Sequence, residues 1–243
     1  MKRFLLFLML FACLGCGEKK NNSPYSIGRD QTWFPIELEG RAANLNAFTN
    51  ALIQEISKEE NIALQFIDTD WLELFASLDN GEVAGIFSAL SPNVVTEDKY
   101  SFSNPIVTLG PVLIVPYNSP ATSLSDLDKK IVAVNQFDDS VLIVQNYPSI
   151  VIQLYQSMPS ILEALNNGEL DAVVMPILEA QALIPSVYPK QLKIVTPPLN
   201  NKAIRLITLK GSNQALMKHF NRGLKQMLST GRYQALREQY QLN

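Results

Sequence analysis

Apolar residues along the chain follow a helical spacing in some segments and a strand spacing in others, and the two alternate. Apolar side chains recur every three or four residues through 45–56 and 215–228, which predicts amphipathic helices. Short apolar runs at 83–87, 112–115 and 131–134 predict buried strands. Strands that alternate with helices indicate an α/β fold, in which each mixed sheet is flanked by helices.

The same pattern predicts further elements and the loops between them. Further strands are predicted at 26–28, 63–67, 170–175, 192–195 and 205–209, and segment 102–107 is expected to lead into the strand 112–115. Further helices are predicted at 158–167, 178–183 and 233–240, and a helix that starts near Trp71 has Asp70 as its predicted N-cap. Segments 88–96 and 136–140 are polar enough to be predicted as loops.

One stretch of this pattern occurs twice. Segments 74–86 and 161–173 both consist of an apolar helical stripe, an Asn-Gly-Glu sequence and a short apolar strand. Because glycine adopts the left-handed conformation that ends a helix, Gly81 and Gly168 predict helix ends. Such units also recur by chance, but their separation fits one small α/β lobe repeated once. Two lobes predict a cleft between them that would bind a small ligand.

The N-terminal residues 1–16 have the features of a secretory signal. A basic pair precedes the apolar run 4–12, which is too short to span a bilayer permanently. The Leu-Gly-Cys that follows resembles the lipobox of bacterial lipoproteins, which implies lipidation of Cys16 and a membrane anchor. Cys13 is a second possible acceptor, and an ordinary signal peptide is the alternative. The polar segment 17–23 is predicted to be a flexible tether.

Composition and charge narrow the possible partners of the rest of the chain. Both cysteines lie in the N-terminal signal, so no disulfide or catalytic thiol is expected in the body. Lys and Arg number 20 against 23 Asp and Glu, and there is no basic block, so nucleic acid is not expected as a partner. We expect a soluble body in the bacterial cell envelope, outside the cytoplasmic membrane.

The sequence shows no constellation of catalytic residues. His219 is the one histidine, and it lies within the predicted helix 215–228. There is no glycine-rich phosphate loop and no His/Cys cluster with metal-ligand spacing. The chain is therefore expected not to be an enzyme and to hold no cofactor or metal.

Short segments distributed along 25–241 carry a resemblance to a known family. They are 27–30, 33–35, 71–86, 88–91, 100–105, 124–127, 132–134, 216–220 and 231–233. In their order and spacing they resemble the extracellular solute-binding proteins of polar amino-acid ABC transporters, which include the lysine/arginine/ornithine- and glutamine-binding proteins.

The resemblance implies a two-lobed periplasmic-binding-protein-like fold with a two-strand hinge. Lobe I would comprise 24–109 plus 204–243 and lobe II would comprise 110–203. The implied function is capture of an amino acid or a related amine-bearing solute in the cleft, with hinge closure over it. A transporter permease is the implied partner, and the protein is expected to be a monomer.

The resemblance also implies ligand-binding residues in lobe I. Trp33 and Trp71 match a pair of family aromatics that face each other across the ligand, where a cation over a Trp face gains about 0.5–2 kcal/mol. Asp30 matches the position that meets the amino end of cationic side chains. Ser88, Ala89 and Ser91 match the loop that holds the α-amino and α-carboxylate groups, with Ala89 in place of a frequent hydroxyl.

Three departures from the family pattern affect the expected ligand. Thr96 replaces the Arg that clamps the α-carboxylate, Pro176 replaces the Asp that holds the α-amino group, and Asn46 replaces a helix-side Asp. An Arg fork matches a carboxylate, and its loss leaves a buried ligand charge poorly paired. Arg29 and Arg205 are the alternative cations that could meet a carboxylate.

Lobe II offers acidic residues at the expected ligand loop. Gln136, Asp138, Asp139 and Ser140 lie where the family has a Gly-Ser/Thr loop that meets the ligand carboxylate. Two carboxylates would attract an amine, so we expect a cationic or amine-bearing solute, or an amino acid in an altered pose. A solvated loop is the alternative reading of these residues.

Two alternative functions remain open. The same lobes could serve as a ligand sensor or adhesion module at the cell surface without uptake. A few relatives of this fold are dehydratases that use cleft carboxylates, for which Asp30, Asp138 and Asp139 are the candidates here.

Overall fold

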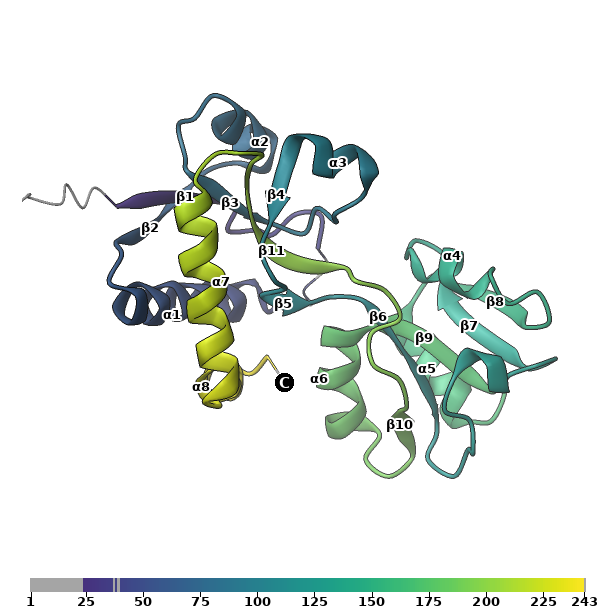
Figure 1. The fold of residues 1–243 in the computed structure, drawn as a ribbon. Coiled ribbons are helices and arrows are strands. Elements are labelled where there is room, and N and C mark those ends of the chain that lie inside the picture. Colours follow the sequence, from purple (N-terminus) through teal and green to yellow (C-terminus); the bar gives the residue numbers. More distant parts are fainter. Residues whose placement is uncertain (1–23, 37, 39, 243) are drawn as a thin grey trace, which may run out of the picture.

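The computed structural model describes residues 24–36, 38 and 40–242, which form two lobes (Figure 1). The predicted signal, the acceptors Cys13 and Cys16, and the tether 17–23 lie outside these residues. Within the described part of the chain, no helix combines the length and the apolar character needed to cross a membrane.

Lobe I is built on a six-stranded mixed sheet with the order β2-β1-β3-β11-β4, in which β5 also pairs with β11. Its strands are β1 (Tyr25–Arg29), β2 (Leu64–Asp68), β3 (Gly85–Ser88), β4 (Tyr100–Phe102), β5 (Val107–Thr108) and β11 (Ala203–Leu209). Its helices are α1 (Ala42–Glu60), α2 (Trp71–Asp79), α3 (Val94–Lys99), α7 (Gln214–Ser229) and α8 (Arg232–Gln239). β1 is parallel to β2 and β3, whereas β11 runs antiparallel to β3, β4 and β5.

Lobe II is built on a five-stranded mixed sheet with the order β10-β6-β9-β7-β8. Its strands are β6 (Pro111–Pro116), β7 (Ile131–Asn135), β8 (Val151–Tyr155), β9 (Ala172–Pro176) and β10 (Leu192–Ile194). Its helical segments are the 3-10 helix η1 (Leu124–Asp126), α4 (Ser140–Val144), α5 (Met158–Asn166) and α6 (Ile177–Val187). β7 is parallel to β8 and β9, and β6 is antiparallel to β9 and β10.

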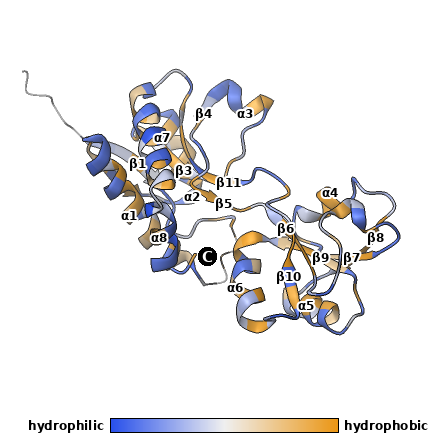
Figure 2. Cartoon of the chain, turned by 60° about the horizontal axis from the view of Figure 1, so that its bottom comes forward, coloured by the Kyte–Doolittle hydropathy of each residue, from blue (hydrophilic) through white to orange (hydrophobic). Residues whose placement is uncertain are grey.

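The core of lobe I follows from the helical spacing of its apolar residues. Leu45, Phe48 and Leu52 of α1 and Phe220 and Leu224 of α7 are fully buried against one face of the sheet. Polar residues occupy most of the exposed positions of these helices, so each helix has a hydrophilic outer side (Figure 2). Burying an apolar side chain of this size contributes about 1.5–3 kcal/mol, so the amphipathic pattern determines which side of each helix packs inward.

The duplicated sequence pattern forms the same structure in both lobes. Gly81 ends α2 with φ of 74° and Gly168 ends α5 with φ of 79°, so both glycines adopt the left-handed conformation that was predicted. The two ends also share their backbone hydrogen bonds. Gly81 N–H donates to Leu78 O and Gly168 N–H to Leu165 O, at 3.1 Å in each case. The two copies of the repeat therefore have the same backbone conformation and hydrogen bonding at the end of the helix.

Two segments of chain cross between the lobes, one between β5 and β6 and the other between β10 and β11 (Figure 1). They are bonded to each other, because Leu109 N–H donates to Lys202 O at 2.8 Å and Leu199 N–H donates to Pro111 O at 2.7 Å. A Cβ added at Gly110 would lie 2.5 Å from the side-chain oxygen of Asn200, so the crossings approach too closely for a side chain there. The predicted lobe boundaries, 24–109 plus 204–243 and 110–203, stay predictions.

Helix α6 connects the lobes on a second side. Leu178 of α6 is buried in the core cluster of lobe I, although α6 follows directly on β9 of lobe II. Arg237 of α8 donates through Nη2 to the Gln181 side chain of α6 at 3.1 Å. The lobes therefore touch through α6 and α8 in addition to the two crossings.

Some elements differ from the sequence predictions. Strand β8 (Val151–Tyr155) was not predicted, and helix α3 (Val94–Lys99) starts inside the predicted loop 88–96. β8 is an edge strand with most side chains exposed, so its residues lack the in–out alternation that marks a half-buried strand. Asp70 does hold the N-cap position of α2, but its side chain makes no capping hydrogen bond.

Candidate ligand site in the interlobe cleft

A cavity lies where the two lobes and the two crossings meet. Lobe I contributes Pro35 and Ile36, and the crossings contribute Leu109 and Lys202, together with Pro111 at the start of β6. Lobe II contributes Asn135, Phe137, Asp138, Asp139 and Met158, and also Pro176, Leu178 and Glu179. The lining therefore combines eight apolar residues with five polar or charged residues, which could orient a ligand.

Phe137 is the large apolar side chain that stands most freely in this cavity. It lies in the turn between β7 and α4, and its side chain is 78% exposed. The turn is held in place by the Asn135 side chain, which accepts a hydrogen bond from Phe137 N–H at 3.0 Å. The exposed ring is therefore available for contact with a ligand or with the opposite lobe.

The two predicted acidic residues of this turn differ in their surroundings. Asp138 accepts a hydrogen bond from Ser140 N–H at 2.6 Å and another from the Ser140 hydroxyl, and Ser140 itself is buried. Asp139 instead forms an ion pair with Lys202 of the second crossing, with 2.8 Å between Oδ2 and Nζ. The hydrogen bond from Lys202 holds the pKa of the Asp139 carboxyl below its usual value.

The acidic character expected of this loop is thereby reduced. Asp138 accepts hydrogen bonds within its own turn, and the charge of Asp139 is balanced by Lys202, which was not among the predicted site residues. Gln136 lies at the start of the same turn, where its backbone N–H donates to Tyr155 O at 2.8 Å. The ligand roles of Gln136, Asp138, Asp139 and Ser140 stay predictions.

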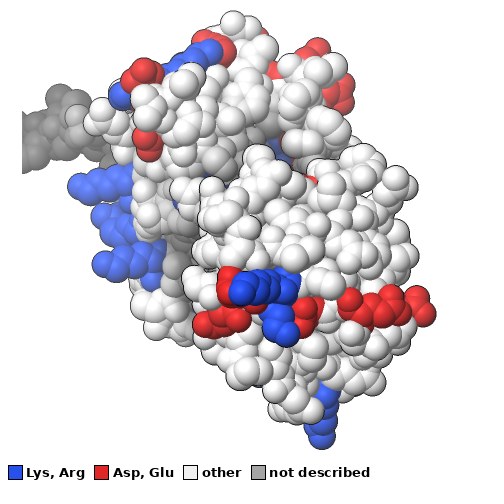
Figure 3. All heavy atoms as spheres, turned by 90° about the vertical axis from the view of Figure 1, so that its right-hand side faces the viewer, with Lys and Arg blue, Asp and Glu red and all other residues white. Residues whose placement is uncertain are grey.

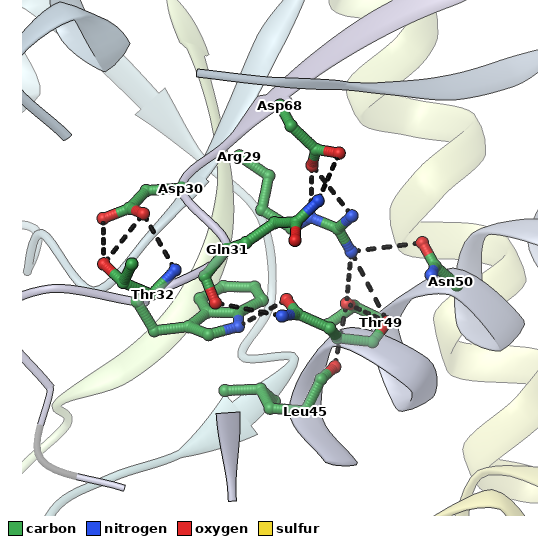
Figure 4. Close-up of polar contacts among 10 residues, drawn as sticks. Arg29, Asp30, Gln31, Thr32, Leu45, Thr49, Asn50 and Asp68 are labelled. Carbon is green, nitrogen blue, oxygen red and sulfur yellow. Dashed lines mark hydrogen bonds and ion pairs between the residues drawn. The ribbon is translucent and has the colours of Figure 1, made fainter. Parts of the chain in front are cut away.

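In lobe I, Asp30 lies in a hydrogen-bonded loop (Figure 4). Trp33 belongs to the same loop, because its backbone N–H donates to Asp30 O. Asp30 accepts from the backbone and the hydroxyl of Thr32, both at 2.8 Å. Trp33 is only 3% exposed, and its indole N–H donates to the Asn46 side chain at 2.7 Å. The Asn46 side chain in turn donates to Gln31 O at 2.9 Å. An amide at position 46 accepts and donates at once, which a carboxylate could not do.

Arg29 is fully engaged within lobe I (Figure 4). Its guanidinium donates twice to one Asp68 oxygen, at 3.1 and 2.9 Å, and also to the Thr49 hydroxyl and the Asn50 side chain. It also lies 4.1 Å from the centre of the Phe66 ring. The expectation that Arg29 could be spare for a ligand carboxylate is therefore wrong for this conformation.

The arrangement of aromatic rings differs from the predicted pair of tryptophans. Trp71 packs edge-on against Phe34, with ring centroids 5.0 Å apart and an interplanar angle of 78°. Both of these rings are accessible, at 37% for Trp71 and 57% for Phe34, whereas Trp33 lies in the core of lobe I. Phe34 is joined to the cavity-lining Pro35 by a cis peptide bond. The ligand-binding roles of Trp33 and Trp71 stay predictions.

The loop after β3 has a clear local function. The Thr96 hydroxyl accepts from Asn93 N–H at 2.9 Å, and the Asn93 side chain accepts from Thr96 N–H at 3.0 Å, which is a capping box at the start of α3. Thr96 also donates to Ser91 O at 3.0 Å. Thr96, at the position of the family's carboxylate clamp, thus organises the loop. The roles of Ser88, Ala89, Ser91 and Thr96 toward a ligand stay predictions.

Arg205, the other alternative cation, secures the second crossing. It is 7% exposed, and it donates to Ser103 O and Asn201 O, both at 3.1 Å. It lies opposite Ser88 in the pairing of β11 with β3. Burial lowers the pKa of its guanidinium. Through these bonds Arg205 attaches the crossing to lobe I.

Several residues that line the cavity were not among the predicted site residues. Phe137 carried a usable signal, because it is a large apolar residue in an otherwise polar turn. Lys202 carried none, since a lysine in a polar connection is ordinarily solvated. Pro35, Ile36 and Met158 belong to separate elements, and only the tertiary structure brings them to one cavity.

Comparison with known proteins agrees with this architecture. The family described as bacterial extracellular solute-binding proteins, family 3, matches residues 25–243. The chain belongs to this family. The resemblance inferred from the sequence is thus confirmed. The role of this protein is that of a substrate-binding component, which binds a solute.

Two relatives are similar to this chain over nearly its whole length. A probable histidine-binding protein of Neisseria gonorrhoeae is 24% identical over 245 residues, covering 96% of this chain and 91% of that protein. The L-cystine-binding protein of Escherichia coli (strain K12) is 23% identical over 224 residues, covering 91% of this chain and 84% of that protein.

The fold of this protein is similar to that of a solved structure. The L-cystine solute receptor of Neisseria gonorrhoeae, in its unliganded open conformation, matches with a TM-score of 0.72 and 16% identity. The match covers 89% of this chain and 92% of that one. At this identity the likeness concerns the fold alone, and it confirms the predicted α/β, two-lobed periplasmic-binding-protein-like class.

Proposed function

We propose that this protein captures an amino acid, or a related amine-bearing small solute, in the interlobe cleft for uptake by an ABC transporter. The observation that carries the proposal is a cavity lined by both lobes and both crossings, with an exposed aromatic ring and one ion pair in it. Hinge closure of the lobes would cover such a solute on both sides. The relatives named for histidine and L-cystine support an amino acid as the solute.

The proposed place of action is the bacterial cell envelope. The family is extracellular by description, and the N-terminal sequence has the features of a signal followed by a lipidation site at Cys16. A lipid anchor there would keep the two lobes near the membrane, where the permease is the proposed partner. The protein is proposed to act as a monomeric binding protein and not as an enzyme.

A thermal-shift screen of residues 17–243 tests the proposed function. The panel contains the common amino acids, polyamines, short peptides and amino-acid amides. Because a ligand that binds only the folded state raises its melting temperature, about 2.7 kcal/mol of stabilisation is expected at one hundred times Kd. A rise with an amino acid supports the proposal. No rise with any member contradicts it and favours a surface sensor or adhesion module.

A further inference from the structure

The ion pair between Lys202 and Asp139 lies at the hinge, inside the interlobe cavity. Lys202 lies on the second crossing and Asp139 in the turn before α4 of lobe II, so the pair bridges the hinge and one wall of the cleft. Both residues line the cavity, and their side chains are 37% and 53% exposed. Solvent, and therefore a solute, can reach both charges.

We propose that Lys202 and Asp139 are the receptor for the zwitterionic head group of an α-amino acid. The inference rests on the proposed function and assigns its binding groups. The solute's carboxylate would meet the Lys202 ammonium, and the solute's ammonium would meet the Asp139 carboxylate. An α-amino acid carries its ammonium and its carboxylate on the same carbon atom. Its head group can therefore lie alongside the Lys202–Asp139 pair so that opposite charges face each other.

The energetics favour this exchange of partners. A solvent-exposed ion pair contributes only about 0–1 kcal/mol, so loosening the Lys202–Asp139 contact costs little. Closure of the lobes removes water from the cleft, and the attraction between opposite charges then strengthens as the local dielectric constant falls. Two ion pairs with the solute would thus form in the closed cleft while one exposed pair is weakened.

The two charges of the Lys202–Asp139 pair fit one class of head group. Asp138 and Glu179 also line the cavity and have other partners, whereas Lys202 and Asp139 bind each other and are both accessible to solvent. One charge of each sign matches a zwitterion, whereas a diamine would bring a second positive charge toward Lys202. The cation-rich solute expected from the sequence is the alternative that arginine binding would reveal.

The remaining lining indicates the side chain of the solute. Around the ion pair the cavity presents Ile36, Phe137, Met158 and Leu178, which come from both lobes. These four residues offer apolar contact to the side chain of the solute. The preferred substrates are therefore amino acids with an uncharged side chain.

Calorimetric titration with matched analogues tests the assignment. The probes are leucine, histidine and arginine, each with its amide, which lacks the carboxylate charge, and its deamino acid, which lacks the ammonium. The unmodified protein is expected to bind leucine or histidine at least tenfold more tightly than either analogue. Lys202→Gln should abolish the preference over the amide, and Asp139→Asn should abolish the preference over the deamino acid.

The control variants remove a similar ion pair elsewhere. Lys130 and Asp171 of lobe II are paired at 3.1 Å outside this cavity, so Lys130→Gln and Asp171→Asn should leave both preferences unchanged. Unaltered preferences in Lys202→Gln and Asp139→Asn would overturn the inference and leave the proposed function standing. Binding of arginine alone would overturn the assigned side-chain class. No binding of any amino acid to the unmodified protein would overturn both proposals.

Discussion

At the scale of single residues, the two tryptophans of this chain have different surroundings. Trp33 is buried in the core of lobe I, with φ of 61° and its indole N–H bonded to Asn46. A bulky residue in the left-handed region persists only where its surroundings fix it, and here the packing and the Asn46 bond do so. Trp71 lies at the start of α2, where its ring meets Phe34 and remains accessible.

Alanine substitutions should separate these two roles. Trp33→Ala is expected to lower the free energy of unfolding by about 3–5 kcal/mol, the usual cost of truncating a buried Trp. Trp71→Ala should cost less than about 1 kcal/mol, because more than a third of its surface already faces solvent. Urea unfolding at pH 7 measures both. Equal losses in the two variants would contradict the burial seen in the structure.

At the scale of elements, α1 and α7 are joined by a charged contact at the edge of their apolar interface. Glu60 of α1 is 9% exposed and accepts hydrogen bonds from Arg222 Nε and from His219 Nδ1 of α7, each at 2.8 Å. The hydrogen bond from Arg222 is the main reason that the pKa of Glu60 lies below its usual value, with His219 adding to it. The ionised Glu60 is therefore favoured by the folded state.

The pH dependence of stability should report this contact. A carboxyl whose pKa is lowered by folding stabilises the fold above its unfolded-state pKa, near 4.5, and loses this contribution as pH falls toward its lower folded-state pKa. Glu60→Gln should therefore lower the melting temperature at pH 7, and the difference from the unmodified protein should shrink below pH 4.5. Melting curves between pH 7 and 3 measure it.

The control for this series is a more exposed pair on the same helix. Glu55 lies 3.5 Å from Arg232, and both side chains are 37% exposed. Glu55→Gln should change the melting temperature less than Glu60→Gln at pH 7. A pH-independent effect of Glu60→Gln would mean that lost packing, and not lost charge, accounts for it.

At the scale of the whole molecule, the hinge depends on the close approach of the two crossings. The atoms that a Cβ at Gly110 would meet are the side-chain oxygen of Asn200 at 2.5 Å and the backbone oxygen of Asn200 at 2.8 Å. Backbone atoms cannot rotate away as a side chain can, so the second crossing would have to shift. The hydrogen bonds of Leu109 and Leu199 between the crossings would then be disturbed.

Gly110→Ala should therefore act on the hinge as a whole. We expect a loss of about 1–3 kcal/mol in unfolding free energy, as for other overpacked sites. We also expect the decrease in radius of gyration caused by a bound solute to become smaller, which small-angle X-ray scattering measures. A variant with unchanged stability and unchanged closure would show that the crossings separate without cost.

Much of the fold was predictable because it depends on local pattern. The spacing of Leu45, Phe48 and Leu52 predicted the buried side of α1, and Gly81 and Gly168 predicted two helix ends with positive φ. Strand β8 escaped prediction because an exposed edge strand need not alternate. The candidate site was only partly predictable, since its charges depend on partners that lie far away along the chain, such as Lys202 for Asp139.

By itself, the sequence determined the class of the fold, the duplicated lobe and the family, because these follow from periodicity, glycine positions and short motifs in order. Only the tertiary structure decided which polar groups are available to a ligand. Asp138, Arg29 and Asn46 are occupied by neighbours within their own lobes, while Lys202 and Asp139 face the cleft. The physical reason is that the availability of a charge depends on its partners and burial in three dimensions, which residue type does not reveal.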